Sequence, residues 1–271
     1  MANLSPNFYP GRIGSDYQGK TVVGKPEIIA LHLTEGNFAS AQGWLCNSAS
    51  QASATRLFSK SGSSIELVSE ADAPWTNGFA VNQIEPPNNA FVKERYWNGK
   101  SGTGYRISPN LFSLTIEIEW FRADGVIPID SPLFAALVRQ VAQWCVKYSI
   151  PATRERIIGH CDISPAEKPF CGRHIPWDYF IPAVAGEVST LKNTNAQKNA
   201  PSAWAEKSWA WAVGQELVNG ENPQGNVTRE MLAEVLYRLM RPKDSSEKPL
   251  QTQPNSDTME PTETLDGQSP K

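Results

Sequence analysis

The stretch "LFSLTIEIEW" (residues 111–120) decides the fold, because it is the clearest β-strand in the chain. The clearest helix follows it in "SPLFAALVRQVAQWCVKYSI" (131–150), where Ser131 can cap the first turn and Pro132 suits the first helical position. One face of this helix is apolar and contains Leu133, Leu137, Val141, Trp144 and Tyr148. A strand followed by a long amphipathic helix predicts a mixed α/β domain with a central sheet.

Shorter elements surround this pair. We expect strands in "EIIALHL" (27–33) and "RIIGH" (156–160), a helix in "NFASAQGWL" (37–45) and a hairpin in "SATRLFSKSGSSIELV" (53–68). Residues 79–110 are rich in glycine, proline and asparagine and read as a long loop. The order predicts α/β architecture, a central mixed β-sheet flanked by helices.

The composition changes after this domain. We expect a large domain over residues 1–185, a polar linker over 186–200, and a small all-α unit over 201–241 with two short helices, the second capped by Thr228. So small a unit has little core and should need a partner surface. Residues 242–271 are rich in Pro, Ser, Thr and acidic side chains, which predicts a disordered tail.

Charge and cysteine content exclude several classes of protein. The formal net charge is -3, so no basic excess favours nucleic acid or an anionic membrane as partner. The four cysteines lack the spacing of a disulfide framework, which favours thiols or a metal ligand. The chain has no apolar run long enough to span a membrane, and its first twenty residues lack a signal pattern. We therefore expect that the protein is synthesised in the cytoplasm and does not insert into a membrane.

A metal site is the sharpest hypothesis for "GHCDISPAEKPFCGRHIPW" (159–177). His32 and His160 each end a predicted strand, so the fold can bring them together, and with Cys171 and a water they would form an open tetrahedral zinc site. Structural histidines, a closed structural zinc site and a redox pair remain alternatives. The last two are disfavoured because the chain offers no C-x-x-C pair and because Cys161 and Cys171 are ten residues apart.

Two charged groups complete the candidate chemistry. Glu117 and Glu119 share one face of the predicted strand, either as a solvated sheet face or with one carboxylate acting as general base. Lys168, three residues before Cys171, is either an exposed loop cation or a group that stabilises the oxyanion formed when water attacks an amide.

Four segments carry a resemblance to a known family. In order, they are "IIALHLTEG", "SKSGSSIELVSEADAPWTNG", "NLFSLTIEIE" and "GHCDISPAEKPFCGRHIPW". Together the first 180 residues resemble the zinc-dependent N-acetylmuramoyl-L-alanine amidases found among phage lysins, wall-recycling amidases and peptidoglycan recognition proteins. The resemblance implies a zinc ion (Zn2+) in a surface groove. It also implies hydrolysis of the amide between N-acetylmuramic acid and L-alanine in peptidoglycan.

The resemblance also assigns roles to individual residues. It implies the metal ligands His32, His160 and Cys171, with His174 as a competitor for the third position. Glu117 rather than Glu119 falls on the family's strand glutamate, and Lys168 falls on its lysine, displaced by one position. The implied substrate contacts are Arg56, Trp75, Thr76 and Asn77. Thr55 and Arg56 stand where many members have a His-Tyr pair.

The C-terminal unit resembles a single S-layer homology module, through "WAEKSWAWAVGQELVNG" and "VTREMLAEVLYRLM". This implies binding of residues 201–241 to a Gram-positive cell-wall polymer, with self-association into a homo-oligomer supplying further copies. The combination resembles a phage endolysin that waits in the host cytoplasm until lysis and then acts on the bacterial cell wall. The rival functions are a non-catalytic peptidoglycan-binding protein and a zinc endopeptidase that cuts within the peptide.

Overall fold

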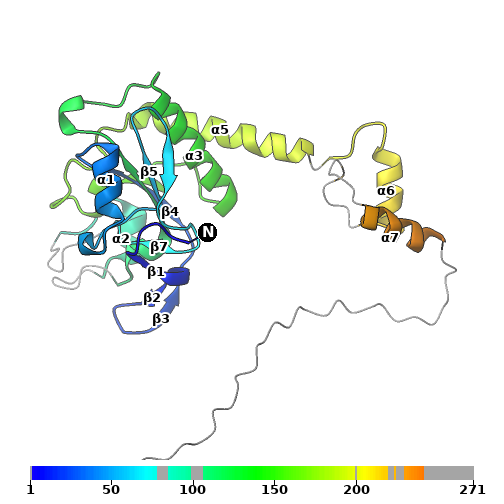
Figure 1. Cartoon of the computed structure of the whole chain (residues 1–271), viewed down its shortest axis with the longest axis horizontal. Coiled ribbons are helices and arrows are strands. Elements are labelled where there is room, and N and C mark those ends of the chain that lie inside the picture. Colours follow the sequence, from blue (N-terminus) through cyan, green and yellow to red (C-terminus); the bar gives the residue numbers. More distant parts are fainter. Residues whose placement is uncertain are drawn as a thin grey trace, which may run out of the picture. The chain divides into compact units, whose positions relative to one another are not determined.

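The computed structural model describes residues 2–77, 85–98, 106–198, 200–218, 223 and 229–240 (Figure 1). Its contacts divide the chain into two compact units, Met1–Ala200 and Pro201–Lys271. Each unit is described by itself.

A five-stranded mixed sheet forms the centre of the first unit, in the order β6-β5-β8-β4-β9. Its strands are β4 (Ile28–Leu33), β5 (Arg56–Phe58), β6 (Ser64–Glu66), β8 (Ser113–Ile118) and β9 (Ile157–Gly159). β6 pairs antiparallel with β5, and the other neighbours are parallel. All residues of β4 are buried, as expected for a parallel strand covered on both faces. The predicted strands, the hairpin and the α/β class are confirmed.

One face of the sheet is covered by α3 (Pro132–Tyr148) and α5 (Trp177–Lys198), which pack against each other (Figure 1). The hydroxyl of Ser131 accepts from the Phe134 amide, so the predicted cap is present. The core beneath includes Ile29, Leu31, Ile116, Ile118, Leu137, Val141, Trp144 and Phe180. Burial of these side chains supplies most of the driving force for folding.

The prediction of a linker over 186–200 is wrong, because α5 continues to Lys198. Val184 is fully buried, and Val188 and Leu191 pack against the same core. These apolar residues recur at intervals of four and three, which places them on one helical face. The polar residues between them face outward and gave the segment its linker-like composition.

The opposite side of the sheet has α1 (Phe38–Leu45), capped by Asn37, and α2 (Ala90–Tyr96), capped by Asn89. The prediction of one long loop over 79–110 is therefore wrong at residues 90–96, which form α2. Val92 and Tyr96 are fully buried at a spacing of four residues, so a single helical turn contributes to the core. Residues 78–84 and 99–105 lie outside the described ranges.

Short elements complete this unit. Two small antiparallel pairs join β1 (Phe8–Tyr9) to β7 (Ala73–Pro74) and β2 (Ile13–Ser15) to β3 (Thr21–Val23). The 3-10 turns are η1 (Pro10–Arg12), η2 (Ser48–Ser50), η3 (Pro109–Phe112) and η4 (Arg122–Asp124). A one-turn helix, α4 (His160–Ile163), follows β9 directly.

The second unit contains the two predicted helices, α6 (Glu206–Gly214) and α7 (Arg229–Met240). Large side chains on or beside them are exposed, with Trp204 at 87%, Trp211 at 54% and Tyr237 at 59%. The predicted cap Thr228 and the predicted tail 242–271 lie outside the described residues. Among the helices described here and in the first unit, none is both long and apolar enough to cross a membrane.

Candidate active site

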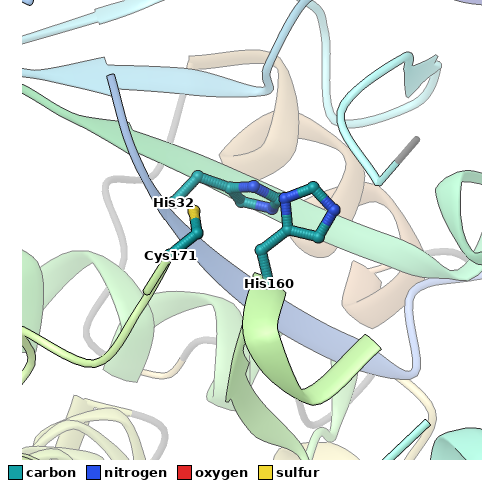
Figure 2. A group of neighbouring side chains, drawn as sticks. All are labelled: His32, His160 and Cys171. Carbon is teal, nitrogen blue, oxygen red and sulfur yellow. The ribbon is translucent and has the colours of Figure 1, made fainter. Parts of the chain in front are cut away.

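Three side chains from separate parts of the chain converge at one end of the sheet (Figure 2). His32 comes from β4, His160 opens α4, and Cys171 lies in the loop that follows. One potential ligand atom from each lies within 4.8 Å of the others, and the two imidazole centroids are 4.5 Å apart. His32 and His160 are 1% and 4% exposed. The structure thus brings together all three predicted metal ligands.

The backbone explains why these residues meet. Leu31 of β4 is in register with Gly159 of β9. The next residue on each chain segment, His32 and His160, therefore lies at the same end of the sheet. The loop carrying Cys171 approaches this level through Gly172, whose φ is +97° and where an added Cβ would lie 2.5 Å from the Gly159 Cα. Only glycine satisfies both the left-handed backbone and the close approach. The Leu33 amide then donates to the Cys171 Sγ at 3.3 Å.

Glu117 is the carboxylate of this site. It is in register with His32 on the adjacent strand, and its Oε1 lies 4.0 Å from His32 Nδ1. Its Oε2 is buried and has no hydrogen-bond partner among the described residues. Burial raises the pKa of Glu117 to about 8, and the positive charge of Lys168 opposes this shift. A carboxyl group with this pKa accepts and releases a proton near neutral pH.

Glu119 has a different role from Glu117. Its two carboxylate oxygens accept hydrogen bonds from the backbone amides of Phe38, at 3.0 Å, and Lys60, at 2.9 Å. Glu119 therefore fixes the start of α1 and the β5–β6 turn. The alternation of the strand left the choice between the two glutamates open; the structure gives both Glu119 oxygens backbone partners and places Glu117 beside His32.

The three potential ligands fit a zinc ion. Burial lowers the pKa of His32 well below its usual value, with the neighbouring His160 adding to the shift, so the His32 imidazole is neutral. Burial and the nearby Glu117 raise the pKa of the Cys171 thiol to about 12, so this thiol must lose its proton when it binds a cation. Two imidazole nitrogens and one thiolate form a donor set typical of zinc.

A cleft of about 380 Å³ opens over these residues. It is lined by His32, Leu33, Glu35, Gln51, Ala52, Trp75, Thr76, Glu117, Arg122, His160, Glu167, Lys168, Pro169, Phe170 and Cys171. The predicted residues Lys168, Trp75 and Thr76 thus lie where a substrate would contact them. The cleft leaves space beside the three ligands for a substrate and a water.

The cleft residues that escaped the sequence analysis include Glu35, Gln51, Arg122 and Phe170. Arg122 Nε is 2.9 Å from Glu35 Oε1, and the Arg122 guanidinium lies 4.6 Å from the Phe170 ring centroid. Glu35 and Arg122 follow shortly after the carboxyl ends of β4 and β8. That position was the only available signal, because ligands of open α/β sheets bind beyond the carboxyl ends of the strands.

The structure does not bring three other predicted residues into the cleft. Arg56 is in register with Ile116, so it points to the opposite face from Glu117, and its guanidinium pairs with Glu66 at 3.2 Å. His174 Nδ1 lies 2.8 Å from the Gly125 carbonyl oxygen, and His174 does not belong to the ligand group. Asn77 does not line the cleft but contacts His32 Nε2 through Oδ1 at 3.0 Å.

A comparison with solved structures found, among others, AmpD, the N-acetylmuramyl-L-alanine amidase AmiD and the catalytic domain of PlyG. The crystal structure of a selenomethionine derivative of AmpD has 18% identity and a TM-score of 0.43, covering 66% of this chain and 90% of that one. AmiD from E. coli, in complex with the substrate anhydro-N-acetylmuramic acid-L-Ala-D-gamma-Glu-L-Lys, has 19% identity and a TM-score of 0.42, covering 83% and 86%. The catalytic domain of PlyG has 16% identity and a TM-score of 0.40, covering 69% and 96%.

A comparison with curated protein sequences found no match. The family model for N-acetylmuramoyl-L-alanine amidase (Amidase_2) matches residues 23–174, which is more than half of the 271-residue chain. The matched segment contains His32, Glu117, His160, Lys168 and Cys171. The chain therefore belongs to the N-acetylmuramoyl-L-alanine amidase family of hydrolases.

Proposed function

We propose that this protein is a zinc-dependent peptidoglycan amidase that cleaves the bond between N-acetylmuramic acid and L-alanine. The observation that carries this proposal is the convergence of His32, His160 and Cys171 beside the largely buried carboxyl of Glu117 in an open cleft. His32, His160 and Cys171 would hold the zinc ion, which would acidify the attacking water and polarise the scissile carbonyl. The arrangement offers every group that this reaction requires.

Glu117 moves the proton in this mechanism. Its carboxylate accepts a proton from the attacking water and then donates it to the leaving amine of L-alanine. Because Oε2 of Glu117 has no partner among the described residues, one oxygen is free to take the proton without breaking a protein hydrogen bond. A nearby cation would lower the raised pKa of Glu117 and favour the ionised, basic form.

Lys168 stabilises the charge that develops on the substrate. Its side chain lines the cleft near the ligands and is close enough to affect the pKa of Glu117 and of His32. An ammonium group at this place favours the negatively charged oxygen of the tetrahedral intermediate. Lys168 therefore acts on the transition state, and its loss should lower kcat more than it raises KM.

We propose further that the protein is an endolysin, held in the host cytoplasm until lysis, and that residues 201–241 bind a Gram-positive wall polymer. The exposed aromatic side chains Trp204, Trp211 and Tyr237 on the second unit support a binding role. Stacking of aromatic rings on sugars would suit a glycan-containing partner. Self-association of this unit would multiply a weak individual affinity.

The catalytic proposal is tested by mass spectrometry of the fragments released from purified Gram-positive peptidoglycan, with and without a zinc chelator. We expect intact stem peptides with a free L-alanine amino terminus, released only without chelator. Glu117→Gln should retain zinc and lose about 10²–10⁴-fold in turnover. Fragments cut within the peptide would make the protein an endopeptidase, and binding without fragments would make it a recognition protein.

The wall-binding proposal is tested with the full chain. Trp211→Ser with Tyr237→Ser should weaken co-sedimentation with purified walls while hydrolysis of a small soluble muropeptide stays unchanged, because these residues lie outside the first unit. Wall material stripped of its secondary polymers serves as the control. If wild type and the double variant sedimented equally with intact walls and with stripped walls, the proposed wall-binding role of residues 201–241 would be contradicted.

A further inference from the structure

A buried hydrogen-bond network that includes the Asn77 side-chain amide connects His32 to the start of β8. Asn77 is fully buried, its Oδ1 lies 3.0 Å from His32 Nε2, and its Nδ2 donates to Ser113 Oγ at 2.5 Å. The backbone amides of Thr76 and Asn77 both donate to Asn110 Oδ1, at 3.2 and 2.7 Å. Asn77 is therefore held at both its backbone and its side chain, and its position is fixed relative to β8.

The two nitrogens of His32 have different surroundings. Nε2 faces Asn77, whereas Nδ1 lies on the side of Glu117, 4.0 Å from its Oε1. With Asn77 Oδ1 toward His32, Nε2 must carry the hydrogen and Nδ1 keeps a free lone pair. If the Asn77 amide were reversed, its NH₂ group would require an unprotonated Nε2, and the hydrogen would move to Nδ1. Nδ1 would then be unable to bind a cation.

From this geometry we infer that Asn77 is a positioning residue, which fixes the Nε2–H tautomer of His32 and so presents an unprotonated Nδ1 toward Glu117. This inference rests on the zinc site proposed above, although the tautomer can be measured without metal. It replaces the direct substrate contact expected for Asn77 from the sequence. Residues that orient a ligating histidine in this way contribute about 10–100-fold to metal affinity.

The Asn77→Asp and Asn77→Leu variants separate positioning from packing. The aspartate variant would keep an acceptor for the His32 Nε2–H, while a leucine of similar size removes it. Asn89→Ala is the control for general loss of stability, because Asn89 caps α2 and is not part of the network around His32.

The first readout is the tautomer of His32 in the metal-free protein, from long-range ¹H–¹⁵N spectra of histidine-labelled samples. We expect the Nε2–H form in wild type, Asn77→Asp and Asn89→Ala, and a mixture of tautomers in Asn77→Leu. The second readout is the zinc Kd, which should rise about 10–100-fold in Asn77→Leu and stay close to wild type in the other two.

Several results would overturn the inference. They are a wild-type His32 that carries its hydrogen on Nδ1, an Asn77→Leu variant with unchanged tautomer and zinc Kd, or an Asn77→Asp variant as impaired as Asn77→Leu. The wild-type spectrum decides the question even if Asn77→Leu does not fold. A wild-type protein that shows the expected tautomer but binds no zinc would contradict the proposed function and leave the role of Asn77 supported.

Discussion

Zinc uptake by the metal-free protein should release a proton from Glu117 as well as one from the Cys171 thiol. At pH 7 the Cys171 thiol, with its pKa raised to about 12, is protonated and must lose one proton to bind a cation. Glu117, with its pKa raised to about 8, is about nine-tenths protonated at pH 7, and a cation beside it favours ionisation. The wild-type protein should therefore release about one proton more at pH 7 than Glu117→Gln, which lacks this titrating carboxyl group.

The sign of the pH dependence follows from the raised pKa of Glu117. At pH 9 this carboxyl group is already about nine-tenths ionised, so the difference in proton release between wild type and Glu117→Gln should fall to about a tenth of a proton. Isothermal titration calorimetry in buffers of different ionisation enthalpy measures these numbers directly. A wild-type release equal to that of Glu117→Gln at both pH values would refute the raised pKa of Glu117.

Three further changes test the site and the fold. Lys168→Met should lower kcat about 10²-fold with a smaller effect on KM in a steady-state assay with a soluble muropeptide; an equal rise in KM alone would assign Lys168 to substrate binding. Although burial raises the pKa of Glu70, hydrogen bonds from Lys147 and Trp144 outweigh it and hold the value low, so their stabilisation is lost as pH falls. Glu70→Gln should lower the free energy of unfolding by about 1–2 kcal/mol at pH 7, and urea unfolding at a series of pH values should show a smaller loss of stability toward acid pH than in wild type. An unchanged loss of stability toward acid pH would contradict this role. Val188→Asp should destabilise the first unit by about 2–4 kcal/mol in thermal unfolding, because it places a charge against the core. Unchanged stability would indicate that residues 186–200 are a linker that does not pack on the core.

The sequence predicted those parts of the fold whose signals are local. β8 and α3 are each indicated by the spacing of their apolar residues, and Ser131 caps α3 as expected. α2 escaped because seven helical residues lie between segments rich in glycine, proline and asparagine. α5 was cut short because its exposed face is polar, although Val188 and Leu191 kept the helical spacing. Composition outweighed periodicity in both errors.

The candidate site was predictable in its chemistry but not in its supporting contacts. His32, His160 and Cys171 were chosen by residue type and by resemblance, and all three meet in the structure. The place of Arg56 depended on the face of β5 that it occupies, and the place of Asn77 depended on a partner far away in the sequence. Asn77 contacts a residue 45 positions away, and no local pattern encodes that contact.

The order of the strands explains why this chemistry is found at one end of the sheet. β4 lies between β8 and β9, so it presents His32 to Glu117 on one side and to His160 on the other. His32 and Glu117 are in register, and parallel neighbours in register place their side chains on the same face. Because the strands are buried, these polar groups reach water only through the cleft, and elsewhere they must either find protein partners or remain unsatisfied. Asn77 satisfies His32, but Glu117 Oε2 stays without a partner among the described residues, which is the state expected of a group reserved for a proton in transit.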